Sequence, residues 1–147
     1  MTPPERPSVA YVDSSALVKL VLEEPESEAL LSYLAAARPR VVSSILAAVE
    51  VPRAIGRAEP DDVEAARSRA AAVIRETVLL ELTLTLAERA AAASPRELRA
   101  ADAVHLVSAL ALGSELSAFV AYDRRLLAAA RAAGLPATAP RGGAQPS

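Results

Sequence analysis

The sequence contains no cysteine and only one histidine, and these two shortages exclude several kinds of chemistry. Without cysteine there is no disulfide framework, no thiolate metal site and no cysteine nucleophile. A single histidine excludes a multi-histidine metal centre and weakens any prediction of a Ser-His-Asp triad. Aromatic residues make up only 3% of the chain, so stacking platforms for nucleic-acid bases are scarce.

The chain also lacks long apolar runs and any strong excess of charge. No uninterrupted apolar stretch approaches the ~20 residues that a membrane-spanning helix needs, and residues 1–7 lack the apolar segment of a signal peptide. We therefore expect a cytoplasmic protein with no membrane partner. The formal net charge of −2 gives no overall basic surface. Any binding to RNA or DNA must then use a local patch or a bound cation.

The 147 residues suffice for one domain with a substantial core. Residues 1–7 and 141–147, which are polar and contain proline or glycine, are predicted to be flexible tails of that single domain. Between them, short apolar segments predict strands at 9–13, 41–42, 78–82, 118–122 and 136–139. Helical patterns fill the intervals. This alternation predicts an α/β, three-layer fold, with a short parallel sheet of four to five strands covered by helices on both faces.

Several helix ends carry their own signals. Ser43 or Ser44 is expected to cap a helix that Gly56 stops. The next helix is expected to open at residues 60–62, with proline in its first turn and acids at its positive end.

Two predicted strands run directly into an aspartate, Asp13 and Asp123. In an open parallel sheet, ligands bind beyond the carboxyl ends of the strands, where such carboxylates converge on one crevice. Each aspartate alone is explained equally well as the N-cap of the helix that follows.

Two further acids, Glu50 and Asp102, lie in almost wholly apolar helical stretches. A carboxylate buried there without a partner would cost several kcal/mol. The partner is either an arginine, such as Arg53 for Glu50 and Arg99 for Asp102, or a hydrated metal ion.

These four carboxylates, with no cysteine or histidine in the set, favour a hard cation such as Mg²⁺ or Mn²⁺. Mg²⁺ is usually held by one or two carboxylates plus waters and substrate phosphates, and such sites are typical of phosphodiester cleavage. No phosphate-binding glycine loop, dinucleotide fingerprint or nucleophile elbow competes for the site.

The segments around the four acids resemble the motifs of PIN domains. They are the opening VDSSALVKL at 12–20, Glu50 in the helix after VSS at 42–44, LRAADAVHL at 98–106 and FVAYDRRL at 119–126. Their order and spacing are similar to those of VapC toxins from bacterial VapBC toxin–antitoxin pairs. The resemblance covers about residues 9–140, nearly the whole chain.

This resemblance implies a metal-dependent endoribonuclease that uses Mg²⁺, with Mn²⁺ as the alternative ion. It implies that Asp13, Glu50, Asp102 and Asp123 form the catalytic quartet. The three aspartates would hold the metal, and Glu50 would orient a water or help to hold the ion. The resemblance also implies an RNA substrate, a homodimer and a cognate VapB-type antitoxin.

Three more residues are candidates for supporting roles. Ser15 resembles the small hydroxyl residue of the family, which bonds a carboxylate or a phosphate. Arg124 either contacts an RNA phosphate or lies on a solvated helix face. His105 shares a helix face with Asp102, but its apolar surroundings favour a hydrogen-bonded core residue over a general base.

Two other functions remain open at this stage. One is a metal-dependent phosphohydrolase or DNA nuclease on the same acids, and the other is a catalytically silent α/β binding module. A haloacid-dehalogenase-like phosphatase is disfavoured, because Ser15 stands where that class has a second aspartate after Asp13.

Overall fold

Five parallel strands form one sheet in the order β3-β2-β1-β4-β5. The computed structural model describes residue 3 and residues 5–142, so parts of both predicted tails lie outside the described residues. The strands are β1 (Val9–Val12), β2 (Arg40–Ser44), β3 (Val78–Leu80), β4 (Leu116–Val120) and β5 (Ala137–Thr138). The predicted parallel α/β sheet is confirmed.

Helices connect every pair of successive strands, as parallel pairing requires. They are α1 (Ser14–Val18), α2 (Ser27–Ala37), α3 (Ala47–Ala58), α4 (Val63–Glu76), α5 (Leu84–Ala91), α6 (Ala100–Leu110) and α7 (Arg124–Ala132), with a short 3₁₀ turn at Gly113–Glu115. Within the described residues, none of these helices is long and apolar enough to cross a membrane.

The helix ends agree with the sequence signals at α4 and disagree at α3. Asp62 caps α4 by accepting a hydrogen bond from the Ala65 N–H at 3.0 Å. The predicted cap of α3 was wrong: Ser43 and Ser44 are buried inside β2, and the helix begins only at Ala47, without a side-chain cap. Gly56 does not stop α3 either, because the helix continues to a left-handed Glu59.

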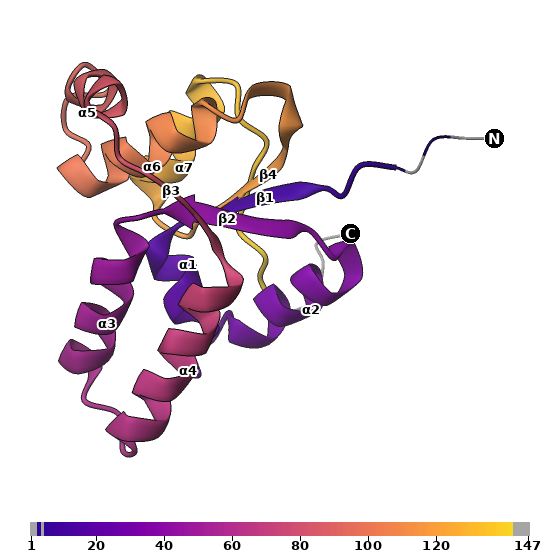
Figure 1. Ribbon diagram of the computed structural model, residues 1–147, viewed down its shortest axis with the longest axis vertical. Coiled ribbons are helices and arrows are strands. Elements are labelled where there is room, and N and C mark those ends of the chain that lie inside the picture. The colour runs from indigo at the N-terminus through magenta and orange to yellow at the C-terminus, as the bar shows by residue number, and fades with distance from the viewer. Residues whose placement is uncertain (1–2, 4, 143–147) are drawn as a thin grey trace.

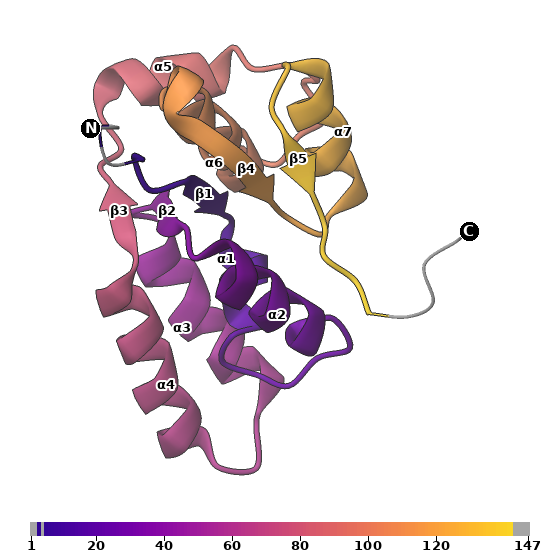
Figure 2. The ribbon, with the colours of Figure 1, turned by 90° about the vertical axis from the view of Figure 1, so that its right-hand side faces the viewer.

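The sheet separates two hydrophobic cores. Helices α1–α4 cover one face and α5–α7 the other (Figure 1), and the view from the side shows the same two layers (Figure 2). Alternation along β1 sends Ala10 and Val12 into the first core and Tyr11 into the second. The protein is therefore a three-layer α/β fold whose central strand contributes to both cores.

A small ionic cluster joins the α1–α2 connection to the end of β4. The Lys19 ammonium lies 2.9 Å from Glu26 Oε2 and 3.3 Å from Glu24 Oε2, and 4.8 Å from the centroid of the Tyr122 ring. Arg141, the first residue of the predicted C-terminal tail, lies 3.4 Å from Glu26 and also faces Tyr122.

We expect Lys19→Met to lower the free energy of unfolding by about 1–2 kcal/mol. Methionine keeps the apolar stem but loses both ion pairs and the cation–π contact, in a place where the Lys19 side chain is only 10% exposed. Urea unfolding at low and high salt measures the effect. Glu64→Gln, which breaks an exposed pair with Arg67, is the matched control and should cost less than about 0.5 kcal/mol. Equal losses in the two variants would contradict the prediction.

Candidate active site

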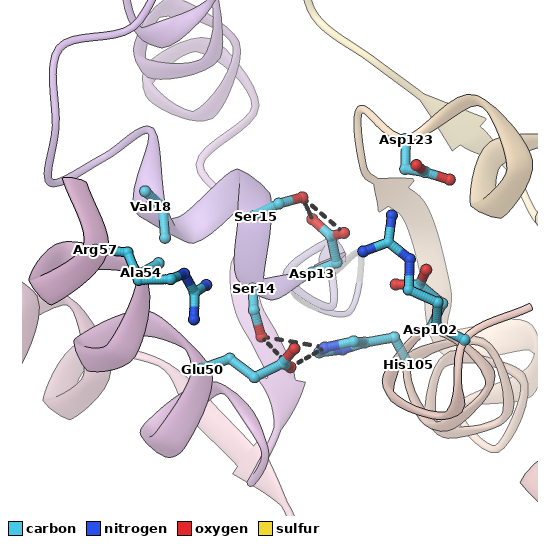
Figure 3. A pocket seen from close by; sticks show the side chains of 11 residues that line it. Asp13, Ser14, Ser15, Val18, Glu50, Ala54, Arg57, Asp102, His105 and Asp123 are labelled. Carbon is cyan, nitrogen blue, oxygen red and sulfur yellow. Dashed lines mark hydrogen bonds and ion pairs between the residues drawn. The ribbon is translucent and has the colours of Figure 1, made fainter.

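A cavity of about 240 Å³ lies at the carboxyl edge of the sheet, where β1 and β4 end. Its walls come from both sides of the sheet, with α1 and α3 on one side and α6 and the start of α7 on the other (Figure 3). The residues that line it are Asp13, Ser14, Ser15, Val18, Glu50, Ala54, Arg57, Arg99, Asp102, His105 and Asp123.

Asp13 caps helix α1 and also faces the cavity. Its Oδ1 accepts a hydrogen bond from the Ala16 N–H at 2.9 Å, and the Ser15 hydroxyl donates to both carboxylate oxygens at 3.0–3.1 Å. Burial raises the pKa of the Asp13 carboxyl to about 6, although these hydrogen bonds act in the opposite direction. Asp13 is therefore a desolvated carboxyl that gains from a nearby cation.

Glu50 is held by two donors from other elements (Figure 3). The Ser14 hydroxyl donates to Glu50 Oε1 at 2.8 Å, and His105 Nε2 lies 2.8 Å from the same oxygen. Burial alone would raise the pKa of Glu50, but the hydrogen bonds from His105 and Ser14 and the charge of Arg57 hold it below its ordinary value. Glu50 is thus kept as a carboxylate.

Asp102 and Asp123 face the cavity from the other side. Asp123 caps α7, because its Oδ1 accepts from the Leu126 N–H at 2.9 Å. Burial and the neighbouring Asp123 charge raise the pKa of Asp102, and the charge of Arg99 offsets part of that rise. The two carboxylates are thus close enough to repel one another, which is an arrangement that favours cation binding.

The structure brings all four predicted acids and Ser15 to one cavity. Asp13 and Asp123 were each explained from the sequence either as a helix N-cap or as a carboxylate of a binding crevice. The structure supports both explanations, since each residue caps a helix and lines the cavity. Arg124 is exposed at the start of α7 and is not among the lining residues.

Of the two kinds of partner left open for Glu50, the arginine named was Arg53, but the groups that stabilise the Glu50 carboxylate are His105, Ser14 and the charge of Arg57. His105 is a buried, hydrogen-bonded residue, as predicted, and it also touches the site. Sequence reasoning missed Arg57 and Ser14. The spacing of seven residues from Glu50 to Arg57, two turns on one helix face, was the available signal.

The donor chemistry fits a hydrated hard cation. Among the described residues, no three carboxylate or imidazole groups stand close enough to form a complete protein-built metal centre. Mg²⁺ requires fewer protein ligands, because waters and substrate phosphates normally complete its octahedral shell. Repulsion between Asp102 and Asp123 and the desolvation of Asp13 are both relieved by a bound cation.

Comparison with known proteins identifies the class. The family model of the PIN domain matches residues 10–132. The chain therefore belongs to the PIN-domain family.

Within that family, the chain is similar to ribonucleases of Mycobacterium tuberculosis. It is 42% identical to ribonuclease VapC46 over 130 residues, which cover 88% of this chain and 96% of that protein. It is 39% identical to ribonuclease VapC35 over 133 residues, with the same coverage of each chain. The crystal structure of VapC20 from the same organism, described as a Sarcin-Ricin loop cleaving toxin, superposes with a TM-score of 0.66 at 22% identity. That match covers 86% of this chain and 95% of VapC20, and it confirms the fold.

Proposed function

We propose that this chain is a single-domain, metal-dependent endoribonuclease of the cytoplasm that acts as the toxin of a type II toxin–antitoxin pair. The observation that carries the proposal is the meeting of four carboxylates from four separate segments in one cavity. The similarity to proteins named ribonuclease VapC supports RNA as the substrate.

In this proposal Asp13 and Asp102 are the principal ligands of the metal ion, which is Mg²⁺ or alternatively Mn²⁺, and Asp123 helps to hold it through a water. When bound, the ion would lower the pKa of a water molecule and neutralise charge on the phosphodiester. Glu50, kept ionised by His105 and Ser14, would orient that water and accept its proton. Ser15 keeps the Asp13 carboxylate in a fixed orientation.

RNA binding in this proposal uses phosphate contacts rather than base stacking. Arg57 and Arg99 lie in the cavity wall and Arg124 is exposed just beyond Asp123. These guanidinium groups suit the oxygens of the phosphate backbone. Substrate choice then depends mainly on the shape of the RNA.

The proposed partners are a second copy of the chain and a VapB-type antitoxin. Four large apolar side chains are exposed where β2 leads into α3 and where β3 leads toward α5; they are Ile45, Val49, Leu82 and Leu84. The Ile45 N–H bonds the Leu80 carbonyl at 2.8 Å, so these two connections are adjacent. Exposed apolar groups of this kind are typical of protein interfaces.

Removal of divalent metal should abolish the activity. We expect the purified chain, free of antitoxin, to cut a total-RNA pool into discrete fragments with Mg²⁺ or Mn²⁺. Excess EDTA should reduce cleavage by at least about 100-fold, because the carboxylates alone supply neither the activated water nor the charge neutralisation. Adding metal beyond the chelator should restore it.

The same assay on single-stranded DNA and on a small phosphomonoester tests the alternatives. Cleavage of these substrates in preference to RNA would replace the proposal with a DNA nuclease or a phosphohydrolase. If the folded chain cuts nothing and calorimetry shows no bound metal, the acidic cavity is structural.

A further inference from the structure

The one histidine of the chain lies in a buried hydrogen-bond chain that begins outside the cavity. His105 is 1% exposed. Its Nδ1 lies 2.7 Å from the Tyr11 hydroxyl, which is fully buried and does not line the cavity. Its Nε2 lies 2.8 Å from Glu50 Oε1 and 3.1 Å from Ser14 Oγ. The imidazole thus links Tyr11 in the second core to the cavity, where Figure 3 shows its contacts with Glu50 and Ser14.

Counting hydrogens assigns the direction of each bond. An ionised carboxylate only accepts, so both groups at 2.8 Å from Glu50 Oε1 must donate. Nε2 therefore carries a hydrogen. In a neutral imidazole the other nitrogen is then an acceptor, and the Tyr11 O–H is the donor that faces it.

The surrounding core fixes the position of the Tyr11 hydroxyl, which is the first donor in this series of hydrogen bonds. The Tyr11 ring stacks on Phe119 with centroids 5.6 Å apart and an interplanar angle of 8°. The same ring meets the His105 ring edge-on, at 5.8 Å and 72°. Because Phe119 is also fully buried, the phenol has little freedom to turn away from Nδ1.

We propose that His105 is a positioning residue for Glu50, and that Tyr11, from β1 outside the cavity, holds His105 in the tautomer with its hydrogen on Nε2. The inference rests on the proposed function for its effect on catalysis, because Glu50 is the carboxylate placed to orient the water. The tautomer itself follows from the hydrogen bonds alone.

The tautomer can be measured without any activity. His105 is the only histidine in the sequence, so a ¹⁵N-labelled chain freed of any histidine tag gives a single imidazole in long-range ¹H–¹⁵N spectra. In spectra recorded at about pH 8, we expect Nε2 to appear protonated and Nδ1 to appear as an acceptor. In Tyr11→Phe the Nδ1 signal should shift, because its lone pair loses the donor. A wild-type spectrum with the hydrogen on Nδ1 would overturn the proposal, and so would an unchanged Nδ1 signal in Tyr11→Phe.

Kinetics test the positioning role. Loss of a supporting partner around a metal site typically lowers the metal affinity or the activity 10–100-fold. We therefore expect His105→Leu to lower kcat within that range, with KM nearly unchanged. His105→Gln, which keeps an amide donor toward Glu50, should recover part of the loss. Tyr11→Phe should lower kcat by about 3- to 10-fold, whereas Tyr33→Phe, which removes a hydroxyl in the other core, should match wild type.

Failure of this inference is distinguishable from failure of the proposed function. A folded wild type that cuts no RNA rejects the proposed function, and the spectra still decide the tautomer. An active wild type with His105→Leu equal to it in kcat rejects the positioning role alone.

Discussion

Replacing Asp102 by asparagine should reduce RNA cleavage by about 10³-fold without destabilising the fold. A metal site supplies several kcal/mol of transition-state stabilisation, and every 1.36 kcal/mol corresponds to a factor of ten. Asparagine keeps the shape of the side chain but lacks the charge that holds a cation. Burial and Asp123 raise the pKa of Asp102, so the ionised form is less favourable in the folded state than in the unfolded state at neutral pH. The neutral variant should therefore have a Tm equal to or above that of wild type.

Single-turnover cleavage in Mg²⁺ and thermal unfolding in EDTA measure the two effects on the same preparations. Asp61→Asn, an exposed position just before α4, is the matched control and should change neither. Activity within tenfold of wild type would remove Asp102 from the proposed metal site. Loss of activity together with a lower Tm would make Asp102 a structural residue instead.

The stability of the metal-free protein should fall as the pH rises from about 4 to about 6, on account of Asp13. Its folded-state pKa of about 6 lies above the ordinary value of 3.8, so the folded state binds this proton more tightly than the unfolded state does. The stabilisation by the protonated form is therefore complete below pH 4 and is lost as the pH passes through 6. At 1.36 kcal/mol for each pH unit, the contribution amounts to about 3 kcal/mol.

Urea unfolding of wild type and Asp13→Asn in EDTA, between about pH 4.5 and 7.5, isolates this contribution. Asparagine caps helices as well as aspartate does, so the variant keeps the α1 cap but has no carboxyl to titrate. The two free energies of unfolding should converge at the acid end, and the variant should be more stable at pH 7.5. Mg²⁺ should raise the stability of wild type at pH 7.5 and leave the variant nearly unchanged. Parallel curves for the two proteins would contradict the prediction.

Local sequence patterns predicted the elements and the four acids because those signals are short-range. Apolar runs that end in Asp13 and Asp123 located two strands and their following helices to within a few residues. A carboxylate in an apolar helix needs a partner, and this marked Glu50 and Asp102. At Ser43 the cap prediction failed, because strand β2 continues through both serines and buries them against its neighbours.

The hydrogen-bond partners inside the site could not be predicted in the same way. Tyr11 and His105 are 94 positions apart, and Glu50 and His105 are 55 apart. Which of two consecutive serines faces Glu50 depends on the orientation of the short helix α1, and it is Ser14. These contacts follow from how α1, α3 and α6 pack around the sheet edge, and no local pattern carries that information.

The arrangement of the cavity across the sheet also has a consequence for synthesis. Asp13 and Glu50 belong to the layer that is synthesised first, whereas Asp102 and Asp123 come from α6 and the start of α7, which follow later in the sequence. A nascent or truncated chain that ends before residue 123 has an incomplete acidic set even when its first layer is folded. Under the proposed function, a fragment that ends before residue 123 is therefore expected to cut no RNA.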